Sequence, residues 1–190
     1  TEAEALEYLA AEKKKNYDAR HHCYAYVLGK NREICRFSDD GEPSGTAGKP
    51  ILEVLLGQEM HDALIVVTRY FGGTLLGTGG LVRAYSQSAS DALFHAGKAQ
   101  VLPVNETGIL CTYPDLARVD RLILSSPFVY EKSRDYGEQV EIRFFLECGA
   151  EAAFQAALDE ASAGRLKLLA LRNTEIVTGS GRFIREYPPV

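Results

Sequence analysis

The sequence predicts an α+β protein made of two domains, and three observations carry that prediction. Residues 63–68 are an unbroken run of apolar and β-branched side chains, which is typical of a strand buried on both faces. After a glycine-rich turn, residues 81–96 show apolar side chains at helical spacing. Residues 105–178 then alternate strand-like and helix-like segments. A length of 190 residues suits one large domain or two small ones.

Composition and charge narrow the class of protein. The four cysteines are scattered without paired spacing, which favours a reduced, cytoplasmic chain. No apolar stretch is long enough to span a bilayer and no signal peptide opens the chain, so we expect no membrane partner. The formal charge of −5 argues against broad electrostatic capture of nucleic acid. Any RNA contact would have to be a local patch.

The first predicted domain covers residues 1–104 and opens with a helix. Thr1 and Glu4 have the spacing of a capping box. Residues 19–29 form a predicted strand that places His22, Tyr24 and Tyr26 on one face and His21, Cys23 and Val27 on the other. A turn leads to residues 33–37, and we expect the two strands to pair. The buried stripe of the first helix is predicted to be Leu6, Leu9, Ala10 and Tyr17.

The rest of this domain is predicted as a short helix, a strand, a long helix and a last strand. The short helix follows Pro50 and ends at Gly57. The long helix ends at Gly97, and residues 99–104 form the last strand, with Pro103 marking the boundary. The inward face of the long helix is predicted to be Leu81, Tyr85, Ser88, Ala89, Ala92, Leu93 and Ala96.

The second predicted domain covers residues 105–178. Strands are predicted at 107–112, 128–133, 139–148 and 166–177, and helices at 115–124 and 150–163. The order β-α-β-β-α-β is that of the split βαβ, ferredoxin-like fold. Residues 179–190 are predicted to be a polar, proline-ended tail.

Two glycine-rich turns, residues 36–50 and 69–83, are the candidate functional site. Each precedes a helix whose first N–H groups and positive dipole end attract anions. Cations lie beside both turns, so the sequence predicts an anion site or a rigid polar surface that a partner reads. The predicted contact residues are Ser44, Gly45, Thr46, Gly48, Lys49, Arg69, Tyr70, Phe71, Gly72, Gly73, Gly77, Gly79, Gly80 and Arg83.

Neighbouring carboxylates offer a competing structural role. Asp39, Asp40 and Glu42 could pair with Arg36, Lys49, Arg69 or Arg83 and hold the two turns together, which would neutralise the cations. The same three carboxylates could instead bind magnesium or act in acid–base chemistry. Both predictions stay open at the level of sequence.

Other chemistries fit the sequence poorly. Pro50 stands where a P-loop has Ser or Thr, and the turn at 77–82 lacks the third glycine of a dinucleotide-binding loop. No base is placed beside a candidate nucleophile such as Ser44, Ser86 or Cys23. We therefore expect no catalytic residue, metal or cofactor. No metal-finger spacing occurs among His21, His22, Cys23, Cys35 and His61.

Residues 36–50, 67–73 and 77–85 resemble the signature of the IMPACT/YigZ family. Residues 22–26 resemble the family's early strand, and residues 105–177 are similar to the second domain of bacterial members. The resemblance implies a first domain with the fold of elongation factor G domain IV and of a small-subunit ribosomal protein. It implies a second, ferredoxin-like domain similar to domain V of that factor. Family members usually have a strand before the first helix; here the chain starts at the helix, which would leave an unpaired sheet edge.

The resemblance also implies a function near translation. Eukaryotic relatives regulate a stress-activated kinase that acts on an initiation factor, by binding one of its activators. For bacterial members it implies a contact with ribosome or RNA. We therefore predict a non-enzymatic, translation-associated regulatory protein that binds ribosome or RNA through the glycine-rich basic surface. The alternatives are a protein-interaction regulator without RNA contact, and an enzyme using Asp39, Asp40 and Glu42.

Overall fold

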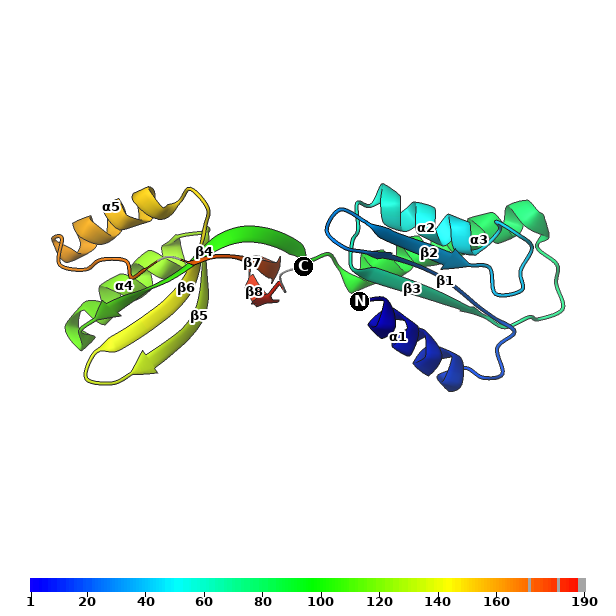
Figure 1. Cartoon of the computed structure of the whole chain (residues 1–190), viewed down its shortest axis with the longest axis horizontal. Helices are drawn as coiled ribbons and strands as arrows, with labels where there is room; N and C mark the ends of the chain where they lie inside the picture. The colour runs from blue at the N-terminus through cyan, green and yellow to red at the C-terminus, as the bar shows by residue number, and fades with distance from the viewer. Residues whose placement is uncertain (171, 181, 188–190) are drawn as a thin grey trace. The chain divides into compact units, whose positions relative to one another are not determined.

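The computed structural model describes residues 1–170, 172–180 and 182–187. It confirms an α+β protein, and the chain divides into two compact units, residues 1–97 and 98–190 (Figure 1). Each unit has its own sheet, helices and apolar core. In the described part of the chain, no helix has the length and hydropathy needed to cross a membrane.

The first unit is built on a three-stranded antiparallel sheet in the order β2-β1-β3. The strands are β1 (His21–Leu28), β2 (Ile34–Ser38) and β3 (Ala63–Arg69). The helices are α1 (Glu2–Lys15), α2 (Gly48–Gly57) and α3 (Gly77–Ala96). α2 and α3 pack on one face of the sheet and α1 packs on the other (Figure 1). The predicted pairing of the first two strands is confirmed.

The alternation of β1 divides the core of this unit as predicted. Cys23, Ala25 and Val27 pack against α2 and α3, while Tyr26 and Leu28 pack against α1. The capping box at the start of α1 is also confirmed. Because β1 is the central strand, it supplies buried side chains to both layers.

Three burial predictions in this unit are wrong. α1 buries Ala5 and Leu9, whereas Leu6, Ala10 and Tyr17 are exposed, because the stripe that meets the sheet is narrow. β3 is an edge strand in which only Ile65 is fully buried, so its apolar run does not indicate a strand covered on both faces. α3 fully buries only Leu81, Tyr85 and Ala89, one residue per turn, among the described residues. The side chains of Ser88, Ala92 and Ala96, which were predicted to face inward, are exposed.

The second unit is a five-stranded antiparallel sheet in the order β5-β6-β4-β7-β8, with both helices packed on one face. Its elements are β4 (Gln100–Cys111), α4 (Tyr113–Ser125), β5 (Val129–Tyr136), β6 (Val140–Glu147), α5 (Glu151–Ser162), β7 (Arg172–Gly179) and β8 (Arg182–Glu186). The order and pairing of β4 to β7 are those of the ferredoxin-like fold.

Both ends of this unit differ from the prediction. Residues 100–111 are one strand, so the unit begins after Gly97 and not after Val104. Pro103 is tolerated because the register with β6 starts only at Val104; beyond it the Pro103 carbonyl accepts from the backbone N–H of Cys148 at 3.4 Å, and no N–H of residue 103 is needed there. The predicted tail, residues 179–190, contains β8, which pairs with β7. The last three residues of the predicted tail, 188–190, lie outside the described residues.

The two edge strands of the second sheet meet. Lys132 on β5 contacts Glu186 on β8 at 2.6 Å and Glu106 on β4 at 2.7 Å. Arg172 on β7 also pairs with both glutamates. These four residues, the closing quartet, lie beside a small apolar cluster formed by Val104, Tyr130, Phe145 and Ile176. The sheet therefore curls over its helix-free face and covers part of it.

We expect Lys132→Met to lower the free energy of unfolding by about 2 kcal/mol, because Glu106 and Glu186 would lose a shared, half-buried cation. Urea denaturation measures the change. Lys167→Met is the matched control: Lys167 also pairs with a carboxylate, that of Asp159, but is exposed, so its loss should cost less than about 0.5 kcal/mol. Equal costs for the two variants would contradict a structural role for the closing quartet.

Candidate functional site

The first glycine-rich turn is closed around the carboxylate of Asp39. Asp39 Oδ1 accepts hydrogen bonds from the backbone N–H of Ala47 at 3.0 Å and of Gly48 at 2.8 Å. Asp39 Oδ2 accepts from the N–H of Gly45 at 2.8 Å. The carboxylate also carries the negative charge that a helix N-terminus favours. The amides predicted to bind an external anion are therefore occupied by the protein's own aspartate.

Gly48 is required by packing. A Cβ atom at this position would lie 2.6 Å from the carbonyl oxygen of Ser38, the last residue of β2. This close approach brings the start of α2 against the end of the sheet, which lets Asp39 reach the first turn of the helix. Thr46 is buried and its hydroxyl donates to the carbonyl of Pro43 at 2.6 Å. The turn is a packed structural element, and of its predicted contact residues Ser44 and Lys49 have exposed side chains.

A buried network centred on Glu42 joins the first turn to β3, β1 and α3. The Glu42 side chain is 5% exposed and accepts a hydrogen bond from the Arg69 guanidinium. The Tyr85 hydroxyl donates to the same oxygen, Glu42 Oε1, at 2.9 Å. His21 Nε2 lies 3.8 Å from it. The thiol of Cys23 lies 3.3 Å from the Tyr85 oxygen and 3.0 Å from the Asp39 carbonyl.

The electrostatics of this network favour a fixed ion pair over reactive groups. Burial alone would raise the pKa of Glu42, but hydrogen bonds from Arg69 and Tyr85 outweigh it and hold that pKa below its usual value. Burial raises the pKa of the Cys23 thiol to about 11 and also raises that of the Tyr85 hydroxyl. A buried thiol with a raised pKa is a poor nucleophile.

A second group of contacts ties α1 to the same turn. The Asp40 carboxylate accepts from Lys13 Nζ at 3.0 Å and from the backbone N–H of His22 at 2.7 Å. These bonds outweigh the effect of burial and lower the pKa of Asp40. His21 Nδ1 lies 2.9 Å from the Asp40 carbonyl oxygen. All three carboxylates of the acidic cluster therefore have internal partners.

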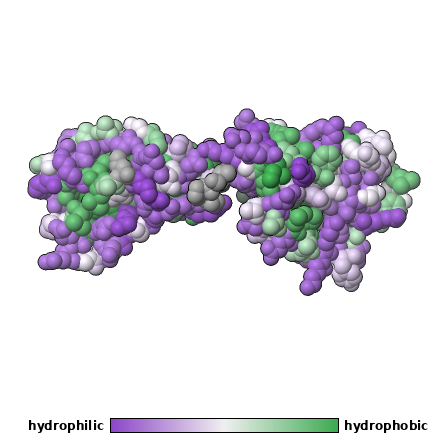
Figure 2. All heavy atoms as spheres, viewed as in Figure 1, coloured by the Kyte–Doolittle hydropathy of each residue, from purple (hydrophilic) through white to green (hydrophobic). Residues whose placement is uncertain are grey.

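The second turn, residues 70–76, is exposed and anchored only at its base. The Tyr70 hydroxyl lies 3.1 Å from Asn16 Oδ1, in the segment after α1. The Phe71 ring contacts two guanidinium groups, those of Arg20 and Arg69. Leu75 and Leu76 are 85% and 47% exposed. Figure 2 shows apolar atoms interspersed among hydrophilic ones over the surface of the unit that carries the N-terminus.

The structure brings some of the predicted site residues together and separates others. Glu42 and Arg69 form one of the predicted ion pairs, and Asp39 caps α2 instead of pairing with a cation. Lys49 contacts Glu53 at 3.9 Å on the surface, and Arg36 donates to the carbonyl of its neighbour Cys35. Among the described residues, Arg83 has no ion pair. Gly72, Gly73, Gly77 and Gly79 are exposed, and Gly80 is half-buried in the first turn of α3.

Sequence reasoning missed the roles of four residues in this region. Tyr85 was assigned to the core, and its hydroxyl is the part that contacts Glu42. The pairing of Lys13 with Asp40 was not predicted. Leu75 and Leu76 were not singled out. An apolar pair inside a glycine-rich turn is the pattern that could have identified them.

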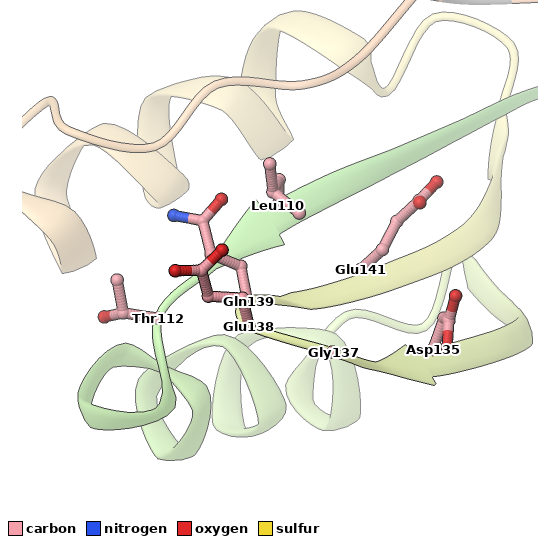
Figure 3. Close-up of a pocket in the computed structure, with 7 residues that line it drawn as sticks. All are labelled: Leu110, Thr112, Asp135, Gly137, Glu138, Gln139 and Glu141. Atoms are coloured by element: carbon pink, nitrogen blue, oxygen red, sulfur yellow. The ribbon is translucent and has the colours of Figure 1, made fainter.

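The cavity shown in Figure 3 lies in the second unit, where β4 ends beside the β5–β6 turn. Its lining includes Leu110 and the carboxylates of Asp135, Glu138 and Glu141, and none of the residues of the glycine-rich turns. In the described ranges, no group of three or more His, Cys, Asp or Glu side chains is arranged to hold a metal ion.

Comparison with known proteins gives consistent matches in both halves of the chain. Residues 1–93 match the model of the Impact N-terminal domain, and residues 109–165 match a domain of unknown function, DUF1949. The chain is 41% identical to the IMPACT family member YvyE of Bacillus subtilis, with 87% of this chain and 76% of YvyE covered. It is 39% identical to the IMPACT family member YigZ of Escherichia coli, with 88% and 82% covered. The Protein IMPACT homolog of Dictyostelium discoideum is 46% identical over 34% of this chain and 19% of its own length.

Proposed function

The chain belongs to the IMPACT family, and on that premise we propose that it is a cytoplasmic, translation-associated regulatory protein that acts by binding and not by catalysis. The partner in this proposal is a protein of the translation machinery. The contact surface is the exposed turn between β3 and α3, residues 70–76.

One observation supports this surface above the others: Leu75 and Leu76 are exposed in a turn whose base is held by an internal network. Exposed apolar side chains next to each other are typical of sites that bind protein. The Glu42–Arg69 pair and the Tyr70–Asn16 contact fix the end of the turn that leaves β3, so less conformational freedom is lost there on binding. The carboxylates that would be needed for an enzyme are meanwhile used in structural contacts.

Contact with ribosome or RNA through the glycine-rich basic surface is the second candidate. Arg83 is exposed, and the N-terminus of α3 has no side-chain cap, so cationic and amide donors remain there. The filled first turn and the neutralised Arg69 remove most of the anion site that the sequence predicts. RNA binding at the glycine-rich basic surface is therefore less well supported than protein binding at residues 70–76.

The paired variant Leu75→Ser/Leu76→Ser tests the surface. We expect it to reduce capture of ribosomal proteins or translation factors from lysate at least about tenfold, because central apolar contacts dominate interfaces. Capture is quantified by mass spectrometry, with and without nuclease, and should survive nuclease. Leu6→Ser/Leu124→Ser is a matched control, since these leucines are 47% and 85% exposed.

Two outcomes would reject the proposal in different ways. If Leu75→Ser/Leu76→Ser captures as well as the unmodified chain, the surface is wrong. If nuclease abolishes capture and Arg83→Glu does the same, the partner is RNA at the glycine-rich surface.

A further inference from the structure

The last turn of α1 and the segment that follows it carry cations that have no part in the internal networks. Lys13 is neutralised by Asp40 at 3.0 Å, but Lys14, Lys15 and Arg20 are exposed. In the described part of the chain, these three side chains have no carboxylate partner. The end of α1 therefore carries positive charge in addition to that of Arg83 at the second turn.

Two aromatic rings accompany these cations. Tyr17 is 85% exposed, and Phe71 is 40% exposed while its ring contacts Arg20 at 5.5 Å and Arg69 at 5.7 Å. The two guanidinium groups restrict the orientation of the Phe71 ring. An exposed ring of this kind can stack on a nucleobase, and every base offers a face to it.

Contacts within the unit bring this segment against the end of β3. The Tyr70 hydroxyl lies 3.1 Å from Asn16 Oδ1 and 3.4 Å from Asp18 Oδ1, and the backbone N–H of Arg20 donates to the carbonyl of Arg69 at 3.1 Å. Asp18 is the one carboxylate in the middle of the segment, and its contact with the Tyr70 hydroxyl gives it an internal partner. These contacts place residues 16–20 beside the end of β3, and Arg20 joins the two segments because its guanidinium group contacts the Phe71 ring.

We infer that this surface binds single-stranded RNA. We call it the α1-end surface, and it consists of Lys14, Lys15, Tyr17, Arg20 and Phe71. The cations contact phosphates, and the two rings stack on bases. Because bases in a duplex are already stacked on each other, an unpaired strand suits the surface better. The inference is independent of the protein-binding surface at Leu75 and Leu76.

The test is a fluorescence anisotropy titration of the full chain with a labelled 12-nucleotide oligouridylate in low salt. Lys14→Glu/Lys15→Glu should weaken binding at least about tenfold and reduce the slope of log K against log[salt] by about 1.4, since each phosphate contact contributes about 0.7. Tyr17→Ala should weaken binding about fivefold or more without changing that slope. Lys30→Glu/Arg32→Glu makes the same charge change at the β1–β2 turn and is the matched control.

Two further probes in the same titration distinguish base stacking from nonspecific attraction of anions to the positive charges. A duplex RNA of equal length and a polyglutamate chain of equal charge should each bind more weakly than the oligouridylate. Leu75→Ser/Leu76→Ser should bind the oligouridylate as the unmodified chain does, so failure here and failure of the protein-binding surface are distinguishable. Circular dichroism establishes that each variant is folded.

Several results would overturn the inference. One is a chain that binds no probe. Another is a control that loses as much affinity as Lys14→Glu/Lys15→Glu. A third is polyglutamate or duplex RNA binding as tightly as the oligouridylate, because that would indicate general attraction of anions. Loss of binding in Arg83→Glu alone would move the RNA contact to the start of α3.

Discussion

Replacing Asp39 with alanine is expected to lower the free energy of unfolding of the first unit by about 3 kcal/mol, because one carboxylate satisfies three backbone N–H groups at the start of α2. Without it those donors are left in a partly buried turn, and the helix loses its favourable charge. Asp39→Asn should cost less, about 1–2 kcal/mol. Its amide oxygen can still accept from Ala47 and Gly48, whereas its amino group faces the N–H of Gly45.

Urea denaturation followed by circular dichroism measures both Asp39 variants. Asp91→Ala is the control, since Asp91 is exposed on α3 and contacts only the side chain of Gln87 among the described hydrogen bonds; its loss should stay within about 0.5 kcal/mol. If Asp39→Ala were as stable as this control, water would be replacing the carboxylate, and the amides of the first turn would again be available to an external anion.

Glu42→Ala is expected to cost about 3–5 kcal/mol, because it leaves the Arg69 guanidinium and the Tyr85 hydroxyl without their buried acceptor. A double-mutant cycle with Tyr85→Phe should show strong coupling, since both changes remove the same hydrogen bond. Glu53→Ala is the matched control: Glu53 pairs with Lys49 on the surface, so we expect a change within about 0.5 kcal/mol. Additive effects of Glu42→Ala and Tyr85→Phe would show that the network is not cooperative.

The Glu42 network also has a pH signature with a defined sign. The pKa of Glu42 is lower in the folded chain than in the unfolded chain, so its contribution to stability is complete above the unfolded value, about 4.3. That contribution disappears as the pH falls through the lower, folded value. The stability difference between the unmodified chain and Glu42→Gln should therefore be constant near neutral pH and shrink below about pH 4. A difference independent of pH would mean that the charge of Glu42 contributes nothing.

Local patterns in the sequence predicted most of the fold because each depends on neighbours along the chain. The alternation of Cys23, Ala25 and Val27 located the central strand, and the capping box at Thr1 located the first helix. The β-α-β-β-α-β order gave the second fold. The apolar run at 63–68 predicted a strand at the right residues but overestimated its burial. β-branched residues also suit an edge strand whose faces are partly covered.

The candidate site was harder to predict because the hydrogen-bond and ion-pair partners of its residues are distant in the sequence. Glycines and cations marked the two turns as candidates, but only the three-dimensional arrangement shows that Asp39 fills the first turn and that Glu42 pairs with Arg69. The domain boundary was missed for a similar reason. Pro103 was predicted to mark the boundary, whereas the strand continues through it because its pairing partner, Glu175, lies far along the chain.

The two sheets differ in how their outer strands are protected, and this has a consequence for handling the protein. β5 has an irregular register between Glu131 and Ser133 and carries Lys132 on its inner face, where it meets β8. β3 pairs with β1 in unbroken register and contains neither proline nor lysine. Such a strand is a template for chain-to-chain pairing. Aggregation on mild heating or storage should therefore begin in the first unit, and a lysine placed in the middle of β3 should delay it.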